Sequence, residues 1–139
     1  MRLRIPNRLE DVFHALDRAE GTLDRAEVDP ACRADVRLVL EELLVNTVRH
    51  GYPDGRDGSI EITLRIEADA VHLELRDDAM AFDPLQHEPP HLPGDIARRE
   101  IGGLGLHLAR SIASDFHYAR DAHGNRVVIR FDPFDEPAT

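Results

Sequence analysis

Hydrophobic and polar residues alternate through two neighbouring segments in the middle of the chain, residues 60–66 and 71–77. Successive side chains of a β-strand point to opposite faces of the sheet, so this alternation is typical of strands with one buried face. Residues 68–70, between the two segments, are expected to form a turn. The pattern therefore predicts an antiparallel hairpin that ends at Asp77.

Two segments before this hairpin repeat apolar residues at the helical period instead. In the first, Asn7 and Glu10 have the spacing of a helix-opening capping arrangement, and Gly21 is expected to end the helix. The expected apolar face of this helix comprises Leu9, Val12, Phe13, Leu16 and Ala19. In the second, Asp29 and the proline after it predict the start of a longer helix that runs to about His50.

The remaining segments predict one more helix, three more strands and a loop. Residues 3–5 alternate with arginines, as in a short edge strand, and the proline-rich residues 84–99 are expected to form an exposed, mobile loop. We further expect a glycine-rich turn and helix over 101–114, strands around 116–118 and 127–131, and a turn at 123–125 between those strands.

This order of elements groups helices apart from antiparallel hairpins, which indicates an α+β fold. We expect a two-layer sandwich in which a mainly antiparallel sheet packs on about three helices. A chain of 139 residues has room for one core. We therefore expect one domain over residues 1–134 and a frayed tail over 135–139.

Composition and charge exclude several classes of function. The chain has 17 Lys and Arg against 27 Asp and Glu, a net charge of −10, which disfavours a sequence-independent hold on nucleic acid. The single cysteine, Cys32, cannot form an intrachain disulfide or a thiolate zinc cage, and suits a reducing cytoplasm. No uncharged apolar stretch is long enough for a membrane span or a signal peptide.

The second helix carries a polar strip on a mostly apolar circumference. Glu42 and Asn46 lie about 40° apart, one turn above the other, with His50 beside them. Hard oxygen donors at this spacing could hold a divalent cation and orient a nucleophile. From spacing alone, the alternative is a solvated helix edge.

Two further segments have the composition of ligand-binding loops. Asp77 and Asp78 end a predicted strand, where a carboxylate could accept a hydrogen bond from a ligand amine or simply form a turn. Glycines at 102, 103 and 105 open a predicted helix, where free backbone N–H groups attract phosphate. Neither a dinucleotide fingerprint nor a P-loop is present, and nothing indicates a serine or cysteine hydrolase.

Taken in order, these three elements resemble motifs of the ATP-binding domain shared by gyrase, Hsp90, histidine kinases and MutL. Within that superfamily they resemble the small bacterial anti-sigma-factor serine kinases of partner-switching systems. The motifs read EELLVNTVRHGY, RDDAMAFDP and IGGLGLHLAR, and the resemblance covers nearly the whole chain. It implies the Bergerat (GHKL) type of two-layer fold.

The resemblance also implies roles for individual residues. It makes Glu42 the general base, Asn46 the magnesium ligand, and Asp77 the partner of the adenine amino group. The other residues that it assigns to nucleotide binding are His50, Ala79, Phe82, Arg99, Gly102, Gly103, Leu104, Gly105 and Leu106. Three departures are visible. Ala79 and Ala81 stand where the family usually has glycines, and the usual later Gly-Thr motif is missing. Ile101 stands where some relatives have an arginine that reaches the terminal phosphate, so Arg98 or Arg99 must substitute.

The function implied by the resemblance is ATP- and Mg-dependent phosphorylation of a serine on a small anti-anti-sigma partner of the STAS type, with inhibition of a sigma factor. Neither direct contact with nucleic acid nor a membrane is expected, and a homodimer could form through the strand at residues 3–5. The alternative is a non-catalytic module that sequesters a sigma factor or another regulator. A third alternative, ranked below these two, is an ATP hydrolase that transfers phosphate to no protein acceptor. Without an upstream phospho-accepting hairpin, a full-length two-component kinase is not expected.

Overall fold

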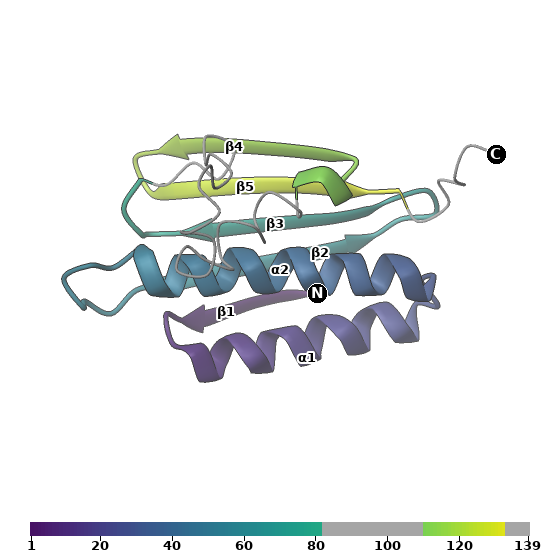
Figure 1. Cartoon of the computed structure of the whole chain (residues 1–139), viewed down its shortest axis with the longest axis horizontal. Coiled ribbons are helices and arrows are strands. Elements are labelled where there is room, and N and C mark those ends of the chain that lie inside the picture. The colour runs from purple at the N-terminus through teal and green to yellow at the C-terminus, as the bar shows by residue number, and fades with distance from the viewer. Residues whose placement is uncertain (82–109, 133–139) are drawn as a thin grey trace, which may run out of the picture.

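The computed structural model describes residues 1–81 and 110–132, which fold into one antiparallel sheet with two long helices on one face (Figure 1). The strand order is β1-β2-β3-β5-β4, and all neighbours are antiparallel. The strands are β1 (Arg2–Pro6), β2 (Ser59–Ile66), β3 (Val71–Asp77), β4 (Asp115–Asp121) and β5 (Gly124–Phe131). The predicted hairpin, β2 and β3, pairs Ile60 with Asp77, and the edge strand at residues 3–5 is confirmed as β1.

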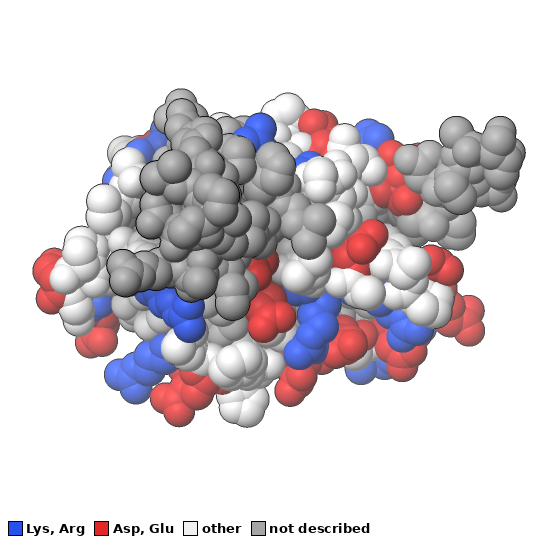
Figure 2. All heavy atoms as spheres, viewed as in Figure 1, with Lys and Arg blue, Asp and Glu red and all other residues white. Residues whose placement is uncertain are grey.

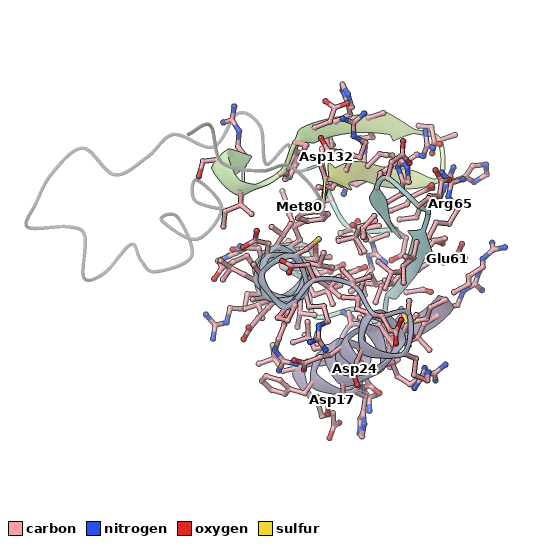
Figure 3. All side chains as sticks on the ribbon, turned by 90° about the vertical axis from the view of Figure 1, so that its right-hand side faces the viewer. Asp17, Asp24, Glu61, Arg65, Met80 and Asp132 are labelled. Carbon is pink, nitrogen blue, oxygen red and sulfur yellow. The ribbon has the colours of Figure 1, made fainter. Side chains whose placement is uncertain are left out.

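The helices α1 (Leu9–Arg25) and α2 (Pro30–His50) form the second layer. Seen end-on in Figure 3, both lie on one side of the sheet, while Glu61 and Arg65 lie on the other. Helix α1 lies near β1, and α2 runs beside α1 toward the middle of the sheet (Figure 1). A further helical turn is present at residues 110–112. The expected α+β two-layer sandwich is therefore confirmed.

The predicted cap of α2 is correct and that of α1 is wrong. Asp29 accepts a hydrogen bond from the backbone N–H of Ala31 at 3.2 Å, as an N-cap should. Helix α1 begins after Arg8, with no side-chain cap. The Asn7 side chain instead bridges to the loop after α2, where it accepts from the N–H of Gly58 at 2.8 Å and donates to the carbonyl of Arg56 at 3.1 Å.

Helix α1 also continues past Gly21, which was expected to end it. Leu23 is only 1% exposed, so the buried face continues one turn beyond Ala19 and past the glycine. Packing of that turn outweighs the cost of about 1 kcal/mol for glycine inside a helix. The expected apolar face is partly wrong as well, because Leu9 is 38% and Phe13 53% exposed.

The core lies between the two helices and the inner face of the sheet. Its fully buried members include Leu16, Leu40, Leu44, Ile62, Leu73 and Ile129. The helical face of the surface is highly charged, with acidic and basic side chains interspersed (Figure 2). None of the helices in the described ranges is long and apolar enough to cross a membrane.

The last hairpin differs from its prediction in one way that matters for the site. Gly124 and Asn125 were expected in the turn, but they are the first two residues of β5. Asn125 pairs directly with Asp77 at the end of β3. The expected mobile loop at 84–99, the glycine-rich turn at its end and the tail at 135–139 lie outside the described residues.

Candidate functional site

The end of α2 and the end of β3 meet at a small cavity of about 30 Å³. It is lined by two of the predicted residues of α2 and β3, Asn46 and Asp77, together with Ala79. Gly51, Met80 and Asn125 also line it. The fold thus brings the first and second motifs to one place, although 30 residues separate Asn46 from Asp77 in the chain.

In the Asn46 side chain, the nitrogen makes a hydrogen bond and the oxygen accepts none from the described residues. Asn46 is 8% exposed, and its Nδ2 donates to the backbone carbonyl of Glu42 at 2.7 Å, one turn back along α2. Its Oδ1 accepts no hydrogen bond from the described residues. The helix therefore holds the amide in one orientation, with a neutral hard oxygen available to a ligand.

Glu42 lies one turn before Asn46 and is half-buried. Burial raises the pKa of its carboxyl, the neighbouring Glu41 raises it further, and Arg49 lowers it. A raised pKa makes a carboxylate a better proton acceptor near neutral pH. Neither Glu42 nor His50 lines the cavity, and His50 is exposed.

Asp77 is held by two donors on the same carboxylate oxygen. Its Oδ1 accepts from the N–H of Ala79 at 3.0 Å and from Nδ2 of Asn125 at 2.9 Å. Burial raises the pKa of this carboxyl, while the bonds from Asn125 and Ala79 oppose the rise. Within residues 1–81 and 110–132, nothing donates to Oδ2. Asp77 thus presents one unoccupied acceptor.

Ala79 stands where the family usually has glycine, and its methyl group fits because Gly51 lies against it. Ala79 is 3% exposed, and a Cβ added at Gly51 would lie only 2.6 Å from the Ala79 Cβ. The backbone N–H of Met80 donates to the carbonyl of Gly51 at 3.0 Å. The methyl group of Ala79 therefore occupies the space left by the missing side chain of Gly51, and the backbone after β3 still lies against the end of α2.

A second set of contacts ties the loop after α2 to Asp78. The Tyr52 hydroxyl donates to Asp78 Oδ1 at 2.7 Å, and the N–H of Ser59 donates to the same oxygen at 3.0 Å. Arg56 lies 4.8 Å from the centre of the Tyr52 ring and donates to the backbone carbonyl of Asp78. Asp78 thus stabilises the loop after α2, whereas Asp77 beside it lines the cavity.

The remaining predicted site residues cannot be placed. Phe82, Arg99 and the glycine-rich motif with Gly102, Gly103, Leu104, Gly105 and Leu106 lie outside the described residues. Among the residues that are described, no three His, Cys, Asp or Glu side chains come together as a metal site. The oxygen of Asn46 is a hard donor that suits Mg²⁺, an ion that usually keeps several waters and takes further oxygens from substrate phosphates.

Comparison with known families gives the fold a name. Residues 5–131 match the model of the histidine kinase-like ATPase domain. The chain belongs to this family. The match spans α1, α2 and all five strands, so the two-layer fold described above is the ATPase fold. Membership in this ATPase family implies ATP binding.

Individual relatives point in the same direction. A serine/threonine-protein kinase, BtrW of Bordetella bronchiseptica, is 31% identical over 97 residues, covering 70% of this chain and 68% of the relative. The anti-sigma F factor of Bacillus velezensis is 25% identical over 92 residues, covering 65% of this chain and 63% of the relative. The structure of the RsbU and RsbW domains of a Mycobacterium tuberculosis protein has a TM-score of 0.62 at 15% identity, covering 95% of this chain and 32% of that one.

Sequence reasoning missed three parts of the site. Asn125 was interpreted as a turn residue, Gly51 only as a helix stop, and Tyr52 was given no role. For Gly51 the sequence offered only the departure at Ala79, where the family usually has glycine, and the contact between the two residues is visible only in the structure. No local signal exists for Asn125, whose partner Asp77 is 48 residues away.

Proposed function

We propose that the protein is an ATP-dependent serine-protein kinase of a partner-switching system, which phosphorylates a small anti-anti-sigma partner and binds a sigma factor. One observation carries the proposal. Two residues on one cavity, Asn46 and Asp77, each have one oxygen fixed in place without a donor among the described residues. One oxygen belongs to a neutral amide and the other to a carboxylate, so they suit two different parts of Mg-ATP.

Asp77 is proposed to recognise the adenine base. A carboxylate oxygen accepts from the exocyclic amino group of adenine and repels the carbonyl oxygen that guanine has at the same position. The cavity of about 30 Å³ is the size of one or two water molecules. It is therefore the deep end of the site, which only the edge of the base would reach.

Asn46 is proposed to hold magnesium through Oδ1, with the phosphates of the nucleotide completing the coordination. When bound, magnesium offsets negative charge on the phosphates during transfer. The hydrogen bond from Nδ2 to the Glu42 carbonyl selects the oxygen end of the amide for this role. The glycine-rich motif, with Arg99 before it and Leu104 and Leu106 within it, remains the predicted phosphate-binding segment.

Glu42 is proposed as the general base. A serine hydroxyl is a poor nucleophile at neutral pH, and a positioned carboxylate accepts its proton as the phosphoryl group transfers. The raised pKa of Glu42 suits this role. His50 is proposed to lie beside the nucleotide, although its side chain is exposed.

The assembly and location of the protein are also predictions. A homodimer would use the free edge of β1, which pairs only with β2 among the described strands. A cytoplasmic location fits the buried free thiol of Cys32. The second candidate function, a module that sequesters a partner without catalysis, is favoured by Ala79 and Ala81 if they weaken nucleotide binding.

Mass spectrometry of a candidate STAS-type partner incubated with the protein and Mg-ATP tests the proposal. The kinase predicts a gain of one phosphate on a serine of the partner. Stable binding of the partner without any phosphate gain would favour the sequestering module. Turnover of ATP without an acceptor would indicate a hydrolase.

A further inference from the structure

Asn125 is one of only two polar residues classed as buried among the described residues, and the other, Asn46, belongs to the magnesium site proposed above. It is 6% exposed and is the second residue of β5. The sequence motifs assign it no role. A buried amide costs stability unless all of its donors and acceptors are satisfied, so its partners are informative.

The side chain of Asn125 uses its full hydrogen-bonding capacity. Its Nδ2 donates to Asp77 Oδ1 and to the backbone carbonyl of Met80, both at 2.9 Å. Its Oδ1 accepts from the Tyr118 hydroxyl at 2.6 Å and from Arg120 Nη1 at 2.9 Å. On Asn125, the Tyr118 and Arg120 side chains both bind the oxygen end, so they fix which end of the amide faces Asp77.

The backbone reinforces this contact. Gly124, directly before Asn125, has a φ of +134°, and a Cβ there would lie 1.9 Å from the carbonyl oxygen of Asp77. No other residue fits at that position. The start of β5 therefore approaches the end of β3 closely, and the register opposes Asn125 to Asp77.

The consequence for Asp77 is a choice between its two oxygens. Both donors that reach it, the Asn125 amide and the Ala79 N–H, bind Oδ1. The carboxylate of Asp77, which lines the cavity, is thereby held in one rotamer, and its Oδ2 has no donor among the described residues.

We propose that Asn125 is a positioning and specificity-determining residue, which orients Asp77 so that its free oxygen accepts from the amino group of an adenine base. The inference rests on the proposed nucleotide-binding function and deepens it. Asn125 also donates to the carbonyl of Met80, so it fixes the backbone just after Ala79, where the usual glycines are absent. A base with a carbonyl oxygen in place of the amino group is rejected because two acceptors would then face each other.

The test compares ADP with inosine diphosphate, which carries a carbonyl oxygen where ADP has the amino group. Calorimetry would measure both affinities, with Mg²⁺, for the wild type, Asn125→Asp, Asn125→Ala and Tyr118→Phe. Asn125→Asp keeps the shape and the acceptor for Tyr118, but replaces the donor to Asp77 with a second carboxylate oxygen. Tyr118→Phe is the matched control, because it removes one bond to Asn125 and none to Asp77, while Arg120 still donates to Asn125 Oδ1 and keeps the amide in its orientation.

We expect the wild type to prefer ADP, and both Asn125 variants to lose roughly tenfold or more of that preference. Tyr118→Phe should keep the preference while lowering the melting temperature. If Asn125→Ala weakens both nucleotides equally and leaves the preference intact, the residue is merely structural and the proposal is overturned.

A second readout needs no nucleotide. Carbon-13 NMR titration of the Asp77 carboxyl should show a higher pKa in Asn125→Ala than in the wild type, because the amide donor favours the charged form. An unchanged pKa would overturn the proposal whatever the nucleotide data show. A raised pKa in a protein whose wild type binds no ADP would overturn the proposed function and leave the orientation of Asp77 by Asn125 standing.

Discussion

Each end of α2 meets the sheet at a cavity that contains at least one aspartate, and the comparison shows what distinguishes a candidate site from a cluster of charges. At the N-terminal end, a cavity of about 240 Å³ is lined by Asp29, Asp35 and Asp132 around Cys32. At the C-terminal end, the cavity is about 30 Å³ and has one carboxylate, Asp77. Cavity volume and number of carboxylates would both favour the N-terminal end as a binding site.

The hydrogen bonds to the aspartates favour the C-terminal end instead. Asp77 receives two donors on one oxygen, whereas no described residue donates a hydrogen bond to the Asp35 carboxyl. Burial raises the pKa of both carboxyls, but only Asp77 has donors that oppose the rise and fix its direction. A defined acceptor, rather than an accumulation of acceptors, therefore marks the end that we propose binds nucleotide.

The largest expected effect is at Glu42. Glu42→Ala should lower the rate of phosphoryl transfer to the partner by roughly 10²- to 10⁴-fold, the usual contribution of a general base. Single-turnover kinetics measure this rate, and calorimetry should show unchanged Mg-ADP affinity. Glu41→Ala, on the neighbouring face of α2, is the control and should transfer phosphate normally. A wild-type rate in Glu42→Ala would mean that another residue is the base.

The next effect concerns the exchange of volume between Gly51 and Ala79. Gly51→Ala places a Cβ 2.6 Å from both the Ala79 Cβ and the carbonyl of Thr47, so overpacking should cost about 1–3 kcal/mol of unfolding free energy. Denaturant titration measures the loss. Adding Ala79→Gly should recover part of it, because one of the two clashes is removed. Full stability of Gly51→Ala would show that the two elements do not pack as described.

The pH dependence of ADP binding should distinguish the two ends. Because the pKa of Asp77 is raised, this carboxyl gains a proton at a pH above the ordinary aspartate value of about 3.9 and then no longer accepts from the base. The affinity should fall about tenfold per pH unit below the pKa of Asp77. Asp35→Asn should leave this profile unchanged, and Asp77→Asn should abolish it. An Asp35-dependent profile would assign binding to the other end.

The raised pKa of Asp77 also affects the free energy of unfolding. A carboxyl whose pKa is higher in the folded state contributes stability below its unfolded pKa, and loses that contribution as the pH rises through the folded pKa. Asp77 should therefore reduce the unfolding free energy at neutral pH, and Asp77→Asn should raise the melting temperature measured by calorimetry. A lower melting temperature in that variant would show that its hydrogen bonds outweigh its desolvation.

The smallest effect is expected at Cys32. Burial and the three nearby aspartates raise the pKa of its thiol to about 11, so it is protonated and unreactive at neutral pH. Cys32→Ser should leave Mg-ADP affinity and phosphate transfer unchanged and lower the melting temperature slightly. Rapid alkylation of Cys32 in the folded protein, followed by mass spectrometry, would contradict this description.

Local patterns predict the elements of this fold well and their mutual contacts poorly. Alternation locates β2 and β3, and the Asp29 cap lies within two residues of its hydrogen-bond partner. Asn7 has an equally good local pattern, yet its side chain is used 51 residues away at Gly58. A polar residue such as Asn or Asp can either cap a helix or bond to a distant loop, and the tertiary structure decides which of the two it does.

The same distinction applies to the site. Glu42, Asn46 and Asp77 could be proposed from the sequence because each belongs to a short motif with a chemical reason for its spacing. Asn125 was not found, because its meaning depends on the β3–β5 register, which no local pattern contains. The residue that fixes the direction of Asp77 could be recognised only once these strands were paired.

The central claim is that nucleotide binds at the C-terminal end of α2, where the Asp77 carboxylate accepts a hydrogen bond from the adenine amino group. Calorimetry of Mg-ADP and Mg-inosine diphosphate binding to Asp77→Asn and Asp35→Asn tests it most directly. Asp77→Asn should lose ADP affinity by roughly tenfold or more and gain relative affinity for the inosine nucleotide, because its amide presents a donor in place of the acceptor. Asp35→Asn should match the wild type for both. Loss of ADP binding in Asp35→Asn with wild-type binding in Asp77→Asn would contradict the account.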